Sequence, residues 1–201
     1  MQTGLDSRFY RILTRIGELM ITSLLFVLCC LPIFTIGASA TALFTVCLKI
    51  VQNKTGYIAK DFFHAFKSNF KQASIIWSIV LALGVLFYVD LQISNVIDGT
   101  AGIVLRAIFW AFLFIWADFA LYVFAVLARF DNTIKATMKN AFWLALGKLP
   151  FTISILVIAI LPWFITYLKA DITWSFIIPF MILIGFGLQG YAESLVFNHI
   201  L

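Results

Sequence analysis

Asp118 is a charged residue inside a long apolar stretch, flanked by eleven and ten residues without charge. A carboxylate at the centre of a bilayer costs about 2.5–3.5 kcal/mol, so such a residue is expected to face the interior of a helix bundle and to have a partner there. Trp110, Phe114 and Tyr122 lie at four-residue spacing from it and share its helical face. The spacing predicts an aromatic-lined polar point inside the membrane.

Two hypotheses follow for Asp118. It contacts a substrate or proton, or it makes a hydrogen bond that holds two helices together, which is the more common use of a polar residue in a membrane span. Gln189, Thr35 and Thr41 are the polar side chains that could serve as its partner, and the sequence does not rank them. Asp118, Gln189 and Thr35 therefore form the candidate intramembrane polar site.

Other motifs favour structural explanations. Cys29, Cys30 and Cys47 lack metal-ligand spacing, and His64 and His199 are solitary, so no metal or cofactor is expected. Residues 185–190 spell G-x-G-x-x-G inside an apolar run without the strand and later acidic residue that a dinucleotide site needs, which indicates close helix packing instead. Glu193 is interpreted as the end of the last apolar run. No nucleophile–base arrangement can be assembled, so the chain is predicted not to be an enzyme.

The composition places the chain in a membrane. Of its 201 residues, 63% are apolar and 11% charged, against about 25% charged in soluble domains. Apolar runs of about 18 residues or more are long enough to cross the hydrocarbon core. The sequence predicts a single integral membrane domain over residues 1–201, an all-α polytopic transmembrane helix bundle with apolar segments at about 19–48, 72–89, 103–128, 149–168 and 172–192.

The first apolar segment is too long for one simple span and has Pro32 near its middle, with Gly37 soon after. Proline and glycine in a helix interior break the hydrogen bonding, so a helix break is predicted from Pro32 to Gly37. One kinked span, two spans and a re-entrant hairpin are the alternatives. Cleavage of a signal peptide near residues 38–40 is disfavoured because the apolar run continues to Leu48.

The basic residues favour a hairpin. A single kinked span would divide the 14 Lys and Arg residues nine to five between the two sides, whereas a hairpin divides them twelve to two. Because cytoplasmic loops carry the excess of Lys and Arg, both termini are predicted to be cytoplasmic. The predicted location is the bacterial cytoplasmic membrane, and the basic excess is assigned to lipid headgroups rather than to nucleic acid.

Two cytoplasmic segments have the pattern of amphipathic helices. In residues 57–71 aromatic residues recur at helical spacing, and a second pattern begins at an expected cap of Asp131 or Asn132. Their basic residues are predicted to contact the membrane surface, and the bilayer is therefore the first expected partner. These residues are Lys60, Lys67, Lys71, Lys135 and Lys139.

Several short segments together resemble the YesL-like family of small bacterial integral membrane proteins, a domain of unknown function. They are residues 31–38 (Leu-Pro-Ile-Phe-Thr-Ile-Gly-Ala), residues 62–72, Ala128-Arg129-Phe130 and Lys139-Asn140-Ala141. The resemblance implies an association with carbohydrate uptake and use, and it supplies no catalytic residues. The expected function is therefore that of a non-enzymatic accessory component or partner of a sugar transporter. The alternative is a small solute transporter acting as a homo-oligomer.

Overall fold

The chain folds into helices throughout the residues that the computed structural model describes, which are 4–54, 56–168 and 176–200. The predicted all-α helix bundle is confirmed. In chain order the elements are α1 (Gly4–Cys30), the short 3-10 turn η1 (Ile33–Thr35), α2 (Ile36–Val51), α3 (Ile58–Val96), α4 (Gly99–Arg129), α5 (Ile134–Gly147), α6 (Leu149–Leu168), the π-helical turn η2 (Met181–Gly185) and α8 (Phe186–Ile200).

The first apolar segment forms two antiparallel helices, as the hairpin hypothesis expected. The break lies between α1 and α2 at residues 31–35, where Thr35 Oγ1 donates to the carbonyl oxygens of Cys29 and Pro32, both at 2.6 Å. At the other end of the hairpin, the Arg15 guanidinium donates to Asn53 Oδ1 beyond the end of α2. Pro32 therefore lies in the break, whereas Gly37 lies in the first turn of α2.

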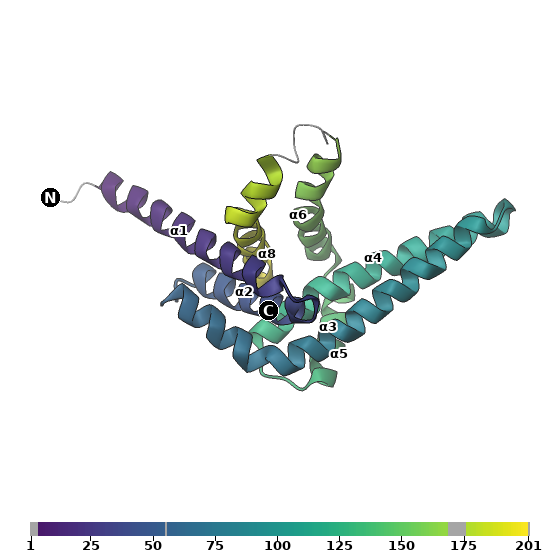
Figure 1. Ribbon diagram of the computed structural model, residues 1–201, viewed down its shortest axis with the longest axis horizontal. Coiled ribbons are helices and arrows are strands. Elements are labelled where there is room, and N and C mark those ends of the chain that lie inside the picture. The colour runs from purple at the N-terminus through teal and green to yellow at the C-terminus, as the bar shows by residue number, and fades with distance from the viewer. Residues whose placement is uncertain (1–3, 55, 169–175, 201) are drawn as a thin grey trace.

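Helix α3 joins two segments that the sequence analysis treated separately. The amphipathic segment at 57–71 and the apolar segment at 72–89 form one 39-residue helix, because no proline or glycine separates them. Figure 1 shows α3 curving, so that its first half lies beside α2 and its second half leaves the bundle with α4. Ser68 Oγ and Asn69 Nδ2 both donate to the carbonyl oxygen of Ala65 at 3.1 Å, and side-chain bonds of this kind bend helices.

Helices α4, α5 and α6 turn sharply at their junctions. Helix α5 begins after an N-cap at Thr133, whose hydroxyl accepts from the Ala136 amide at 3.4 Å, so the expected cap at Asp131 or Asn132 is wrong by one or two residues. The segments Ile134–Gly147 and Pro150–Pro162 are bent by 100° relative to each other. Pro150 lacks an amide proton and cannot continue α5.

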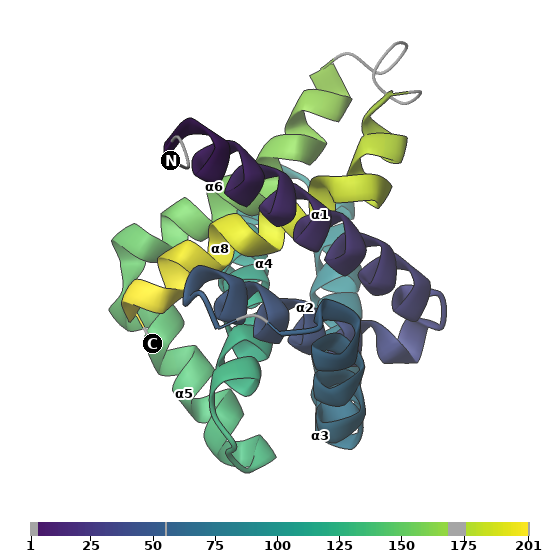
Figure 2. The same ribbon diagram turned by 90° about the vertical axis from the view of Figure 1, so that its left-hand side faces the viewer.

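The core lies where α2, α4 and α8 converge near the first half of α3 (Figures 1 and 2). The ring of Phe197 is fully buried and makes edge-on contacts with Phe44 at 5.7 Å and with Tyr122 at 5.0 Å between centroids. Close backbone approach supports this packing. A Cβ on Gly37 would lie 2.7 Å from the Ala73 carbonyl oxygen, and one on Gly187 would lie 2.3 Å from the Leu19 carbonyl oxygen.

The chain is a multi-pass membrane protein. Among the described residues, five helices are long and apolar enough to cross a bilayer, and the bent pair Ile134–Gly147 with Pro150–Pro162 brings the total to as many as six. Two contacts gather chain segments at one end of the first hairpin: Arg15 with Asn53, and Gln52 Nε2 with Asn198 Oδ1 at 3.1 Å. An even number of membrane crossings would place the N-terminus, the residues after α2 and the C-terminus on the same side of the membrane, in agreement with these two contacts.

We predict that this end faces the cytoplasm, because it carries the N-terminal arginines and the lysines of residues 49–71. In a chain with Cys29, Cys30 and Cys47 replaced by alanine, a single cysteine at Lys54 or His199 should be protected from an impermeant thiol reagent in intact cells. A cysteine at Asp98, in the α3–α4 connection, should be labelled. External labelling at Lys54 would contradict the predicted topology.

Candidate functional site

Asp118 lies inside the bundle, with 5% of its surface exposed. It occupies the middle of α4, one helical turn before Tyr122, whose ring contacts Phe197 of α8. Its Oδ1 atom is buried and has no hydrogen-bond partner among the described residues. The expected burial of Asp118 is therefore observed, and its role stays a prediction.

The three expected partners of Asp118 bond elsewhere. Thr35 bonds within the helix break, Thr41 Oγ1 donates to the Gly37 carbonyl oxygen at 2.9 Å, and Gln189 Nε2 donates to Glu193 Oε1 at 3.1 Å. Two of the three are satisfied by backbone close to them in sequence, as serine and threonine commonly are in helices. The structure thus does not gather Asp118, Gln189 and Thr35 into one hydrogen-bonded cluster.

Glu193 is a second buried acid that the sequence interpretation placed at the end of a span. Only 2% of its surface is exposed, and it lies in α8 one turn before Phe197. Its Oε1 atom accepts from Gln189, while the Gln189 Oε1 atom is itself buried and without a partner in the described part of the chain. The four-residue spacing of Gln189 and Glu193 within an apolar run was the signal that could have identified this pair.

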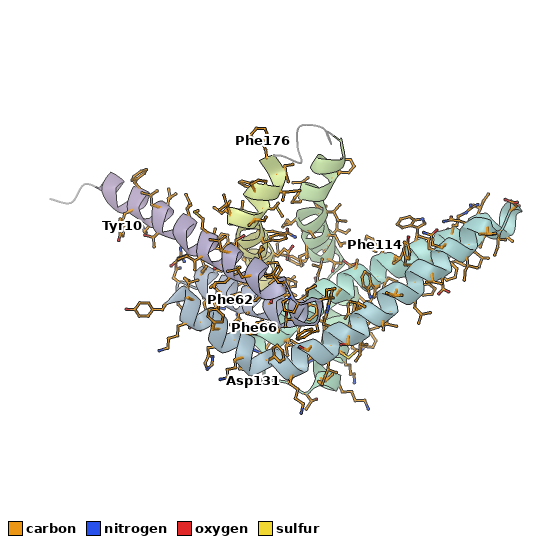
Figure 3. The ribbon with its side chains drawn as sticks, in the orientation of Figure 1. Tyr10, Phe62, Phe66, Phe114, Asp131 and Phe176 are labelled. Carbon is orange, nitrogen blue, oxygen red and sulfur yellow. The ribbon has the colours of Figure 1, made fainter. Side chains whose placement is uncertain are left out.

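Asp118 precedes Tyr122, and Glu193 precedes Phe197, by four residues, so each acid lies one helical turn from one ring of the Tyr122–Phe197 contact. Figure 3 labels Phe114, which lies on α4 one turn before Asp118 in the sequence. No group of three or more His, Cys, Asp or Glu residues able to hold a metal occurs in the described ranges. Each of these two buried carboxyl groups has few hydrogen-bond donors around it in the described part of the chain.

A hydroxyl chain connects α4 with the α5–α6 bend. Thr152 Oγ1 donates to the Ala145 carbonyl oxygen at 2.9 Å and lies 2.9 Å from the Tyr122 hydroxyl oxygen. Because the threonine proton is used on Ala145, the Tyr122 hydroxyl is the donor to Thr152. These two hydrogen bonds hold the start of α6 against α4, the helix that carries Asp118.

We predict that Tyr122→Phe lowers the free energy of unfolding by about 1 kcal/mol, the usual net value of one hydrogen bond. Thr152→Val should cost more, because it leaves both the Tyr122 hydroxyl and the Ala145 carbonyl oxygen without a partner. Denaturant unfolding in detergent micelles measures both effects. Tyr88→Phe is the matched control, since Tyr88 is 59% exposed, and an equal loss in that variant would contradict the prediction.

The five lysines predicted at the membrane surface all have exposed side chains: Lys60, Lys67, Lys71, Lys135 and Lys139. They come from the first half of α3 and from α5, whose apolar sides pack inward through residues such as Phe62 and Ala141. Nitrogen-tipped side chains project along the lower edge of Figure 3, near the labelled Asp131. Contact of these lysines with lipid stays a prediction.

Comparison with known proteins agrees with the resemblance. Residues 19–91 match the family described as "Protein of unknown function, DUF624". The uncharacterized protein YteU of Bacillus subtilis (strain 168) is 26% identical over 159 residues, which are 79% of this chain and 71% of YteU. The uncharacterized protein YesL of the same strain is 27% identical over 135 residues, 67% of this chain and 63% of YesL. No solved structure matches. The predicted resemblance to the YesL-like family is confirmed.

Proposed function

We propose that this chain is a non-enzymatic accessory subunit that binds a carbohydrate transporter within the membrane. The observation that carries the proposal is the α3–α4 hairpin, whose end at the connection between Val96 and Gly99 projects away from the bundle (Figure 1). Its side chains there include Ile93, Ile103 and Trp110, which are 57%, 62% and 62% exposed. Such an arm offers apolar helix faces on which the spans of another membrane protein can pack.

Packing between spans is driven by van der Waals contact and by occasional hydrogen bonds, since lipid already covers apolar side chains. A projecting two-helix arm therefore gains from a partner whose spans fit its surface. A carbohydrate transporter is proposed as the partner because the residues that resemble the YesL-like family imply it. A contact within the membrane is proposed because five helices of the described residues are long and apolar enough to cross a bilayer.

We predict that a photo-crosslinking residue at Ile103 forms an adduct with a transmembrane subunit of a carbohydrate transporter in native membranes. The matched control is Leu28 of α1, which is 61% exposed but lies outside the α3–α4 hairpin. Sugar uptake should fall in cells that lack the chain, while the purified chain alone should give no flux in vesicles. Adducts at Ile103 with lipid alone, together with unchanged uptake, would contradict the accessory function.

A transporter is the second candidate, and the burial of Asp118 and Glu193 favours it. Ionisable residues inside membrane spans commonly mark substrate or proton pathways. In this case the purified chain would conduct solute by itself, as a homo-oligomer, and the accessory function would be excluded. Flux measured in reconstituted vesicles separates the two candidates.

A further inference from the structure

An apolar groove of about 540 Å³ lies between the α3–α4 hairpin and α5. Its walls include the stacked rings of Phe87 and Phe112, whose centroids are 5.8 Å apart, and the side chains of Trp116 and Phe119. Helix α5 closes one side through Met138. The volume falls within the range of about 300–1,000 Å³ that is typical of ligand sites.

The groove has one cation at its border. Lys139 lines it from α5, has an exposed side chain and takes part in no ion pair among the described residues. Lys135 lies one turn earlier on the same helix, and Asp131, just before α5, is the nearest acid along the chain. The site therefore joins apolar walls to a free ammonium group.

We propose that this groove binds an anionic phospholipid, with one acyl chain against the aromatic walls and the phosphate at the Lys139 ammonium. Neither alternative ligand uses both halves of the site, because a soluble anion would leave the apolar walls uncovered and a zwitterionic lipid would gain little from the lysine. Basic sites bordering membrane helices recognise anionic headgroups, and each such lysine contributes about 1 kcal/mol. This corresponds to a preference of about five-fold over a zwitterionic lipid.

Trp116 is a reporter within the groove. Its indole Nε1 donates to the Val80 carbonyl oxygen at 2.9 Å, which fixes the ring against the groove. A phospholipid with brominated acyl chains quenches tryptophan fluorescence on contact. The difference in quenching between the natural chain and Trp116→Phe isolates this tryptophan from the other five of the six in the sequence.

The experiment compares brominated phosphatidylglycerol with brominated phosphatidylcholine, using the full chain in vesicles. We expect the first to associate about five-fold more strongly at Trp116 and this ratio to fall to about one in Lys139→Gln. Lys60→Gln, which removes an exposed lysine far from the groove in the sequence, should keep the ratio. Native mass spectrometry should show retained phosphatidylglycerol that is lost in Lys139→Gln.

Three results would overturn the proposal. A ratio near one in the natural chain would mean that only unselective boundary lipid reaches Trp116. An unchanged ratio in Lys139→Gln would remove the lysine from the site. Quenching that stays unchanged at an excess of inorganic phosphate sufficient to occupy Lys139 would show that the lipid is not held through its headgroup.

Discussion

Gly187→Ala is expected to lower the free energy of unfolding by about 1–3 kcal/mol, the usual cost of overpacking a close contact. The new Cβ would lie 2.3 Å from the Leu19 carbonyl oxygen and 3.0 Å from its carbonyl carbon. Both are backbone atoms, so α1 and α8 must move apart as whole helices. The packing of Ser23 in α1 should be affected too, because its hydroxyl donates to the carbonyl oxygen of Met181, the first residue of η2, at 3.1 Å.

Gly17→Ala is the control, since a Cβ at Gly17 of α1 would meet no atom within 4 Å. Replacing a helical glycine by alanine favours the helix by about 1 kcal/mol, so the two variants should change stability in opposite directions. Denaturant unfolding in micelles measures the difference. Equal effects in both variants would show that α1 and α8 do not approach each other as closely as the structure has them.

Asp118→Leu is expected to raise the free energy of unfolding, by up to about 2.5–3.5 kcal/mol, the cost of a charged residue at the centre of a span. The reason is that Asp118 is buried and its Oδ1 atom lacks a partner in the described part of the chain. Removing an unsatisfied buried group and replacing it by an apolar side chain of similar size restores packing without a desolvation cost. Unfolding in micelles tests the sign of this change.

Measurements of flux and of stability in Asp118 variants separate the two hypotheses for this residue, which are a substrate or proton contact and a hydrogen bond between helices. A residue kept at a cost in stability is typical of functional sites, so under the transporter hypothesis flux should fall in Asp118→Leu while stability rises. Asp118→Asn keeps the shape and removes the acid, and under the transporter hypothesis it should abolish flux or change its pH dependence in a folded protein. A loss of stability in Asp118→Leu, together with rescue in Asp118→Asn, would instead indicate a structural hydrogen bond.

The sequence predicted those features that depend on local composition. The break at Pro32, the helical apolar segments and the burial of Asp118 each follow from residues within one or two turns. The continuity of α3 was missed because Lys71 and Gln72 change the polarity of the chain without ending the helix. Charge marks where a chain meets water, whereas a helix ends only where its backbone bonding ends.

Features that depend on distant packing could not be predicted in the same way. Glu193 looked like a boundary residue because it ends an apolar run, yet it is buried in α8, whose neighbours include α1 and α2, more than a hundred residues earlier in the chain. Gly187 belongs to a motif that correctly indicated close packing, yet nothing in its neighbours identifies Leu19 as the contact. Pairings of this kind require the tertiary fold.

The contact between α2 and α8 also sets an order of events during synthesis. Cys47 and Gly187, whose Sγ and carbonyl oxygen atoms lie 3.8 Å apart, are separated by 140 residues. At about 5–20 residues per second, the ribosome needs about 7–28 s to supply the second after the first. Throughout that interval α2 lacks the contact with α8 that it has in the folded chain. The nascent chain is then open to membrane proteases, so a substitution that delays the docking of α8 should reduce the amount of protein in the cell beyond what its equilibrium stability alone would predict.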